Sequence, residues 1–246
     1  MKERWIYGFH AIRARLRSAP GSVKEVWVDE SRHDARMRDL LALMSGAGLA
    51  VRMADGGRLD KMVGGARHQG VVAKVEPVAM ARTLDEVVED IAGAPLIVVL
   101  DGVTDPHNLG AVLRSADAFG AHAVIAPKDK SVGLNATVEK VACGAAETVP
   151  YLMVTNLARS LDELKEHRVW TVAADAAADK TIDRIDAKAG IAWVLGAEGA
   201  GLRQLTRKTC DEAARIPIGG SVESLNVSVS AAICLYESAR QRGETP

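Results

Sequence analysis

The stretch LIVVLDGVTDPHNLGAVLRSADAFG, residues 96–120, decides the fold class of this chain. It begins with an uninterrupted run of aliphatic side chains, LIVVL, which predicts a strand buried on both faces. A loop rich in Gly, Asp and Pro follows, and apolar residues then recur at helical spacing over residues 108–119. A strand, a loop and a helix in this order predict one unit of a parallel α/β sheet.

The same order of elements continues towards the C-terminus. We predict further strands at 123–126, 169–174, 191–195 and 215–218, and helices at 137–145, 156–167, 202–209 and 225–240. Aliphatic strands that alternate with helices are typical of a mostly parallel sheet covered on both faces. The tract DAAAD at 175–179 is interpreted as a loop of small residues.

Shorter patterns precede residue 96. Helices are predicted around Ile12 and Leu16, at 34–47 and at 59–63, and strands at 24–28, 49–53 and 70–75. We therefore assign residues 1–76 to a small α/β domain, 77–93 to a linker and 94–246 to a larger domain. Within the linker, the sequence TLDE at 83–86 fits a capping box and predicts a short acidic helix through residue 91.

Charge is divided unevenly between these parts. The 246 residues include 31 Lys and Arg against 32 Asp and Glu, so the whole chain is not strongly basic. Residues 1–76 nevertheless carry 14 basic and 9 acidic side chains, and the excess of acidic residues lies in the remainder. A basic module on an acidic body suggests a polyanionic partner for that module. An ordinary solvated surface would have the same composition.

Composition and motifs exclude several other classes of protein. Three scattered cysteines, Cys143, Cys210 and Cys234, are too few for a disulfide framework or a zinc site. The first residues contain no apolar signal segment, and the longest apolar run is far shorter than the ~20 residues of a membrane-spanning helix. A P-loop lysine motif and a hydrolase nucleophile elbow are missing as well. We expect a cytoplasmic protein that does not bind a membrane.

Three segments rich in Gly, Asn and Ser follow predicted strands, where parallel α/β sheets bind their ligands. They cover residues 101–115, 196–202 and 219–228. Each has an ordinary structural explanation when taken singly, because small residues permit close helix packing and Asn or Ser residues cap helices. The glycine loop follows the penultimate strand rather than the first, which argues against a dinucleotide site.

Taken together, the three segments resemble the three motifs of the SpoU/TrmH branch of the SPOUT RNA methyltransferases. The matching stretches are DGVTDPHNLGAVLRSADAFG, LGAEGAGL and IPIGGSVESLNVSVSAAICLYE, which lie within residues 101–237 in the order and spacing of that family. IYGFHAI at 6–12 and HQGVVAKV at 68–75 resemble the small RNA-binding domain of the family, which is of the ribosomal protein L30e type.

This resemblance implies a fold, a reaction and partners. The larger domain would be an α/β domain whose parallel sheet ends in a deep C-terminal trefoil knot, and the N-terminal domain would be L30e-like. S-adenosyl-L-methionine would donate a methyl group to a ribose 2′-hydroxyl without a metal. A homodimer would form through the knot and the last helix, which is apolar on most sides.

Two long stretches narrow the implied substrate. Residues 108–129 and 134–150 most resemble members of the family that methylate a guanosine in the peptidyl-transferase region of 23S rRNA. The expected partner is therefore 23S rRNA or a precursor of the large subunit. The alternatives are the same chemistry on tRNA and a non-catalytic RNA-binding role. Candidate phosphate contacts in the basic module are Arg13, Arg15, Arg17, Lys24, Arg32, Arg36 and Arg38.

The resemblance also assigns roles to single residues. Arg114 would deprotonate the attacking 2′-oxygen or stabilise its developing charge, and Asn108 would position Arg114 or the substrate. Glu198 would orient Arg114 or neighbouring loops. Ser224 and Asn226 would form hydrogen bonds to the methyl-donor loop or to the target nucleotide. The cofactor would be held largely by backbone groups around five residues, Leu195, Gly196, Ile216, Ile218 and Leu225.

Overall fold

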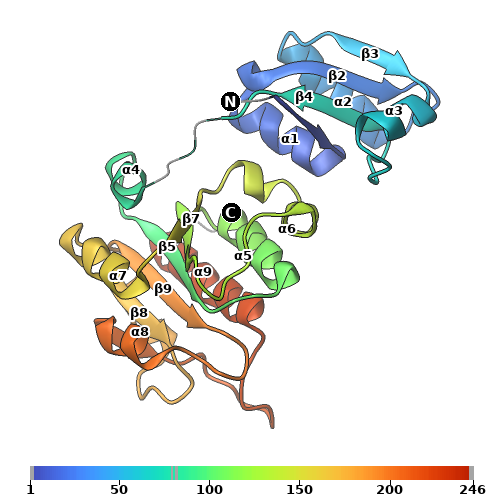
Figure 1. Ribbon diagram of the computed structural model, residues 1–246. Coiled ribbons are helices and arrows are strands. Elements are labelled where there is room, and N and C mark those ends of the chain that lie inside the picture. Colours follow the sequence, from blue (N-terminus) through green and yellow to red (C-terminus); the bar gives the residue numbers. More distant parts are fainter. Residues whose placement is uncertain (1–2, 79, 81–82, 244–246) are drawn as a thin grey trace. The chain divides into compact units, whose positions relative to one another are not determined.

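The computed structural model describes residues 3–78, 80 and 83–243. Internal contacts divide the chain into two units. One consists of Met1–Met80 with the short segment Cys143–Thr148, and the other of Ala81–Ala142 with Val149–Pro246. Each unit has its own β-sheet (Figure 1).

The N-terminal unit contains a four-stranded sheet with the order β1-β4-β2-β3. Its elements are β1 (Arg4–Tyr7), α1 (Phe9–Ser18), η1 (Pro20–Ser22), β2 (Val23–Asp29), α2 (Ala35–Gly46), β3 (Val51–Ala54), α3 (Gly56–Met62) and β4 (Val71–Val75). β4 is antiparallel to both of its neighbours, and β2 and β3 are parallel. The predicted pattern missed β1, a strand of only four residues that begins with Arg4.

The two faces of this sheet are covered to different extents. Helices α1 and α2 bury Ile12, Leu16 and Leu40 against Val26 and Val28 of β2. The other face is covered by the seven-residue helix α3, whose Leu59 packs beside aromatic side chains of the sheet. One face is therefore a complete core, whereas the other has less cover.

The C-terminal unit contains a six-stranded sheet with the order β10-β8-β9-β5-β6-β7, and every adjacent pair is parallel. Its strands are β5 (Leu96–Asp101), β6 (Ala123–Pro127), β7 (Tyr151–Val154), β8 (Trp170–Ala174), β9 (Ile191–Gly196) and β10 (Glu212–Ala214). Its helices are α4 (Leu84–Glu89), α5 (Pro106–Ala118), α6 (Ala136–Ala142), α7 (Leu157–Glu166), η3 (Ile182–Arg184), α8 (Gln204–Thr209) and α9 (Val227–Arg242). The predicted α/β class with a parallel sheet is confirmed.

Helices cover both faces of the six-stranded sheet, as Figure 1 shows. Helices α4, α7 and α8 lie on one face, where Leu84, Leu161 and Leu164 join the core beneath them. Helices α5, α6 and α9 lie on the other face, where α5 packs against both α6 and α9. The central strands β5 and β9 are buried on both sides, which explains why all but the last residue of each strand is apolar.

Most of the predicted elements are present, with boundaries shifted by a few residues. The capping box is seen at Thr83, whose Oγ1 accepts the backbone N–H of Glu86 at 3.2 Å. The strand predicted at 215–218 is wrong, because the pairing residues are Glu212–Ala214. Only Arg215 forms an isolated bridge beyond them, and Pro217 has no N–H to continue the ladder. Strand β7 was not predicted.

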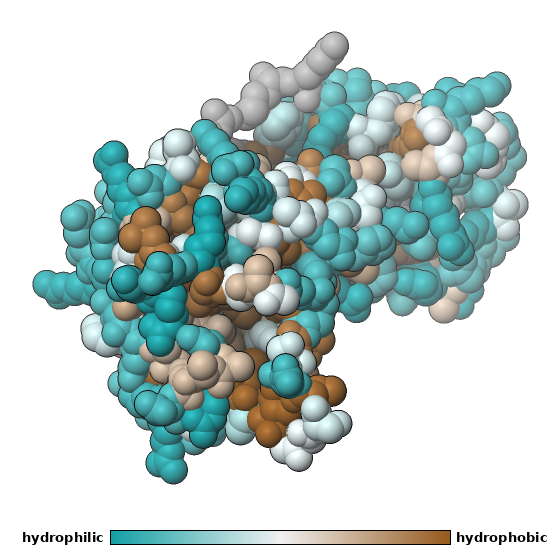
Figure 2. Space-filling model, turned by 60° about the horizontal axis from the view of Figure 1, so that its bottom comes forward, coloured by the Kyte–Doolittle hydropathy of each residue, from teal (hydrophilic) through white to brown (hydrophobic). Residues whose placement is uncertain are grey.

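No helix in the described part of the chain is long and apolar enough to cross a membrane. On the surface, exposed hydrophobic side chains form patches between hydrophilic ones (Figure 2). Two of the most exposed apolar residues of α9 are Val229 at 46% and Tyr236 at 47%. They lie beside a shallow groove between α5 and α9 that Ala111, Ser115 and Ile233 also line.

Candidate active site

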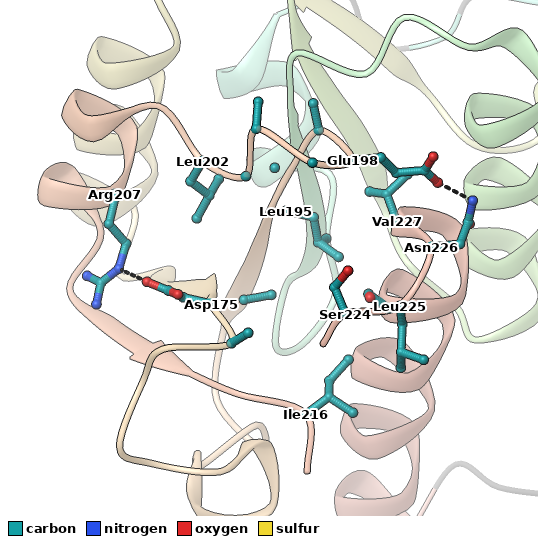
Figure 3. Close-up of a pocket in the computed structure, with 18 of the residues that line it drawn as sticks. Asp175, Leu195, Glu198, Leu202, Arg207, Ile216, Ser224, Leu225, Asn226 and Val227 are labelled. Carbon is teal, nitrogen blue, oxygen red and sulfur yellow. Dashed lines mark hydrogen bonds and ion pairs between the residues drawn. The ribbon is translucent and has the colours of Figure 1, made fainter. Parts of the chain in front are cut away.

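A cavity of about 680 Å³ opens at the carboxyl ends of β8 and β9 (Figure 3). A volume of this size accommodates a drug-sized or cofactor-sized molecule. Its lining comes from the segments that follow β8, β9 and β10 and from the start of α9: Ala174–Ala176, Leu195–Leu202, Arg207, Ile216, Ile218, Ser224–Val227 and Ser230. The cavity therefore lies where parallel α/β sheets bind ligands.

The loop after β9 forms the tightest backbone crossing of the site. Gly201 bridges back to Ala197 and donates its N–H to the carbonyl of Ala197 at 2.9 Å. A Cβ atom on Gly196 would overlap the backbone of Gly201 and Leu202, so only glycine fits at this position. The loop is thus folded onto the end of its own strand and leaves its backbone groups beside the cavity.

Three predicted residues meet at one side of the cavity. Asn108 and Asn226 each donate a side-chain N–H to Oε1 of Glu198, the first at 3.2 Å, and Asn226 also donates to Oδ1 of Asn108 at 3.0 Å. They come from the first turn of α5, the loop after β9 and the N-cap of α9. Segments that are far apart in sequence are thereby joined by three polar side chains.

Asn226 owes its orientation to the start of α9. Its Oδ1 accepts the backbone N–H of Ser228 at 2.8 Å and the hydroxyl of Ser228 at 2.6 Å, as an N-cap residue does. Its Nδ2 is consequently directed towards Glu198 and Asn108. Asn226 can cap α9 and also hold the polar cluster, because its Oδ1 performs the first role and its Nδ2 the second.

An ion pair lies on the side of the cavity opposite Glu198 and Asn226, as Figure 3 shows. Nε of Arg207 on α8 donates to Oδ2 of Asp175 at 2.8 Å, and Oδ1 of Asp175 accepts the N–H of Ala177 at 2.9 Å. The hydrogen bond from Arg207 lowers the pKa of the Asp175 carboxyl below its ordinary value. Asp175 thus stays ionised and fixes α8 to the end of β8.

A buried carboxylate, Asp101, holds the end of the glycine loop that follows β9. Asp101, the last residue of β5, is 1% exposed and accepts two hydrogen bonds from Arg203, from the backbone N–H at 3.1 Å and from Nε at 2.6 Å. Arg203 immediately precedes α8. A buried charge is tolerated only when it is paired, so this contact fixes the position at which the glycine loop enters α8.

The structure does not bring every predicted residue into this cluster. The five residues expected to hold a cofactor, Leu195, Gly196, Ile216, Ile218 and Leu225, all line the cavity, and so does Ser224. Arg114 is exposed on α5 and lies outside the lining. It lies three residues after Ala111, which lines the α5–α9 groove, and residues at this spacing are neighbours on a helix surface.

Asp175 and Arg207 were missed by the sequence analysis, as were Asp101 and Arg203. Asp175 directly follows a buried strand, which is the position where ligand-binding residues occur in parallel sheets, although its tract was interpreted only as a loop. The sequence contained no signal for Arg203 or Arg207, because their partners lie in other elements. Within residues 3–78, 80 and 83–243, no group of three or more His, Cys, Asp or Glu side chains is arranged to hold a metal ion.

Two family models match the chain. Residues 95–236 match the SpoU rRNA Methylase family, and residues 5–81 match a domain described as RNA 2′-O ribose methyltransferase substrate binding. The first match covers the cavity and the three motifs. The second covers the four-stranded sheet.

Similar proteins with curated names share nearly the whole length of this chain. A protein from Bordetella pertussis named 23S rRNA (guanosine-2′-O-)-methyltransferase RlmB is 59% identical over 235 residues, which is 96% of each chain. The protein of the same name from Escherichia coli is 48% identical over 240 residues, covering 96% of this chain and 98% of the other. Among solved structures, the SpoU methyltransferase AviRb from Streptomyces viridochromogenes in complex with AdoMet matches with a TM-score of 0.74 at 26% identity. The match covers 99% of this chain and 92% of that one.

Proposed function

Because this chain belongs to the SpoU rRNA methylase family, we propose that it transfers a methyl group from S-adenosyl-L-methionine to the ribose 2′-hydroxyl of a guanosine in 23S rRNA. The target nucleotide lies in the peptidyl-transferase region. The tRNA alternative is not favoured, since the relatives at 48% and 59% identity are named for 23S rRNA. An rRNA substrate also implies the cytoplasmic location expected from the sequence.

The observation that carries this proposal is the network of Asn108, Glu198 and Asn226 at the edge of the cavity. It joins all three motif segments at one point, as a site that must align two substrates requires. A non-catalytic RNA-binding protein would have no need for such a network beside a cavity. The intact residues therefore support an enzyme.

The cavity has the features that S-adenosylmethionine needs. Leu195, Ile216 and Leu225 offer an apolar surface for the adenine ring, and the folded loop after β9 offers backbone donors and acceptors. We assign Leu195, Gly196, Ile216, Ile218 and Leu225 to cofactor binding. When bound, the cofactor supplies a methyl group on a sulfonium, which is a good leaving group.

The protein must then align the 2′-oxygen with that methyl group and stabilise the negative charge that develops on the oxygen as the hydroxyl proton passes to water or to a phosphate. A ribose hydroxyl is a weak acid, so electrostatic stabilisation of the developing alkoxide is required. We assign this task to Arg114, since a guanidinium is a permanent cation in ordinary surroundings. Asn108, Glu198 and Asn226 hold the segments that position the nucleotide, and Ser224 contributes a hydroxyl at the cavity wall.

Arg114 acts in a homodimer in this proposal. Its place beside the α5–α9 groove puts it at the edge of the exposed apolar surface that includes Val229 and Tyr236. A second copy that packs there would bury this surface and enclose Arg114. The active site would then be completed by two chains that meet through the knot and the last helix.

We further propose the deep trefoil knot and the division of labour expected from the sequence. The segment that precedes α9 lines the same cavity as the loop after β9, which supports a knotted segment that ends in α9. Residues 1–76 form the L30e-like domain that selects RNA, residues 77–93 link it, and residues 94–246 carry out methyl transfer. The match of residues 5–81 to a substrate-binding model supports this assignment.

The decisive experiment measures transfer of a labelled methyl group to unmodified 23S rRNA and, in parallel, to unmodified tRNA. The wild-type protein and Arg114→Ala are compared. We expect label at one site of 23S rRNA that resists alkaline cleavage, and no label with the variant. Label in tRNA would preserve the chemistry and overturn the substrate, whereas no label in either RNA or in large-subunit precursors would overturn the enzymatic function.

A further inference from the structure

One face of the N-terminal sheet displays aromatic side chains that its helices do not fully cover. The strand register places two rows of side chains, from paired positions on neighbouring strands, on this face. The first row is Tyr7, Val72, Trp27 and Arg52, and the second is Trp5, Lys74 and Glu25. Trp5 and Tyr7 are only partly buried and stand on β1, at the edge of the sheet. We call these two rows the aromatic face.

The cover of the aromatic face is incomplete because α3 is short. A helix of seven residues extends only about 10 Å, and it packs on β2 and β4 through Leu59. Strand β1 lies beyond β4 in the sheet order. The rings of Trp5 and Tyr7 therefore remain accessible beside Lys74, whereas the opposite face of the same sheet is sealed by α1 and α2.

Two arginines place their guanidinium groups over the third aromatic ring. The guanidinium of Arg58 lies 4.4 Å from the ring centroid of Trp27, and that of Arg52 lies 5.2 Å from it. Trp27 is itself 7% exposed, so its outer surface is formed by these two cations. The side chain of Arg52 is 59% exposed. Planar guanidinium groups fixed in this way can stack on bases as well as contact phosphates.

Acidic groups only partly balance this charge. Glu25 accepts from Trp27 Nε1 at 3.2 Å and lies 3.7 Å from Arg52, and Glu3 pairs with Lys74 at 2.5 Å. The Glu3 carboxylate raises the pKa of Lys74, so this amine stays charged. Asp55 accepts the backbone N–H of Arg58. The side chain of Arg58, which reaches the aromatic face from α3, is exposed to solvent over Trp27 and can meet an anionic ligand there.

We propose that the aromatic face binds unpaired bases of the RNA substrate, with Trp5 and Tyr7 stacking on bases and Arg52 and Arg58 contacting bases or phosphates. Aromatic rings interleaved with cations favour unpaired nucleic acid, because every base has a π-face and each nucleotide carries a negative charge. The substrate-binding match, over residues 5–81, includes Trp5, Tyr7, Arg52 and Arg58. This inference rests on the proposed function, since it identifies how that RNA is held.

The test compares three variants of the full-length protein in RNA-binding titrations at several salt concentrations. They are Trp5→Ala with Tyr7→Ala, the conservative pair Trp5→Phe with Tyr7→Phe, and Arg52→Gln with Arg58→Gln. The RNAs are unmodified 23S rRNA, a short unstructured RNA and a duplex of the same length. Cofactor affinity, which depends on the other unit, and thermal unfolding serve as controls.

We expect the alanine pair to bind the unstructured RNA about tenfold more weakly or worse, with an unchanged dependence on salt. The phenylalanine pair keeps its affinity within about twofold. The glutamine pair binds more weakly and lowers the salt dependence by about one to two phosphate contacts. Duplex binding changes little in the aromatic variants, because stacked bases inside a duplex cannot reach the rings.

Unchanged affinity of a folded alanine pair would overturn the proposal. If the alanine pair does not fold, the glutamine pair decides, because Arg52 and Arg58 are exposed and their replacement leaves the core intact. Unchanged RNA affinity and salt dependence of the glutamine pair would then overturn the proposal. A change in oligomeric state without loss of RNA affinity would identify a protein interface and also overturn it. Methyl transfer by the wild-type protein is scored separately, so failure of the proposed function stays distinguishable from failure of this face.

Discussion

Nδ2 of Asn226, the residue that caps α9, donates a hydrogen bond of 3.0 Å to Oδ1 of Asn108 in the first turn of α5. The two residues are 118 positions apart. The other end of the Asn226 amide accepts the N–H of Ser228. One side chain thus fixes the start of a helix and holds a segment from the opposite end of the C-terminal unit.

Asn226→Asp separates these two tasks. The carboxylate still accepts the Ser228 N–H, so the helix cap is retained, but the donor to Asn108 is lost and a second negative charge faces Glu198. We expect a fall in kcat of about tenfold to a hundredfold from misplaced segments. The free energy of unfolding should change by less than about 1 kcal/mol, whereas Asn226→Ala should also lose about 1 kcal/mol of cap stability. Full activity of Asn226→Asp would contradict the role of the network.

Arg114→Ala tests the assignment of the catalytic cation. Turnover should become undetectable, and cofactor affinity measured by calorimetry should stay within a few-fold. Because Arg114 is exposed, its loss should alter the free energy of unfolding by no more than about 0.5 kcal/mol. Arg159→Ala, which removes an exposed arginine from α7, is the matched control and should remain active. A loss of cofactor affinity as large as the loss of rate would refute the catalytic role.

Gly196→Ala tests the close crossing of the loop after β9. The new methyl group would overlap the backbone of Gly201 and Leu202, which cannot retreat as a flexible side chain can. Denaturant unfolding should show a loss of about 2–4 kcal/mol, together with weaker cofactor binding. Gly219→Ala, where an added Cβ meets nothing within 4 Å, should be tolerated. Equal stability of both variants would show that the backbone at Gly201 and Leu202 has room for a methyl group on residue 196.

Asp175→Asn tests the ion pair on the far side of the cavity. The pKa of Asp175 is lowered in the folded protein, so the pair stabilises the fold above the ordinary carboxyl pKa of ~3.9. That stabilisation is lost as pH falls through the lower folded value. Both side chains are partly exposed, at 31% and 40%, so we expect a difference of only about 0.5 kcal/mol at pH 7 that shrinks as pH falls below the ordinary carboxyl pKa. A difference that grows on acidification would have the wrong sign.

Val229→Asp tests the proposed dimer. Val229 is 46% exposed beside the α5–α9 groove, and a carboxylate buried there between two copies would be unpaired. We expect a monomer by light scattering and a loss of methyl transfer with an unchanged fold. Leu205→Asp replaces a residue that is 66% exposed on α8 and should leave the dimer intact. A monomeric wild-type protein with full activity would remove the need for a second chain.

The sequence predicted the parallel sheet well because β5 and β9 are buried on both faces and their sequences, LIVVLD and IAWVLG, are apolar along almost their whole length. It failed where pairing depends on a distant partner. β10 is a three-residue edge strand, and its apolar extension over Ile216–Ile218 serves the cavity wall instead of the ladder. The apolar residues at 216–218 predicted a strand because apolar side chains are common both in buried strands and in the walls of ligand cavities.

The sequence likewise predicted some residues of the candidate site and missed those that depend on distant partners. Motif similarity located Asn108, Glu198 and Asn226, but not which atoms meet, since Oε1 of Glu198 receives both amides. Asp101 and Arg203 are 102 positions apart, and no local pattern links a buried strand-end carboxylate to a helix that begins so much later. Only the folded chain reveals such pairs.

The double use of Asn226 has a consequence for heat tolerance. The first turn of a helix opens locally at a lower cost than the whole domain unfolds, and amide hydrogen exchange detects such opening. Fraying at Ser228 would release the Asn226 side chain and, with it, Glu198 and Asn108. The temperature at which methylation ceases is then set by one helical turn, below the temperature at which the sheet melts.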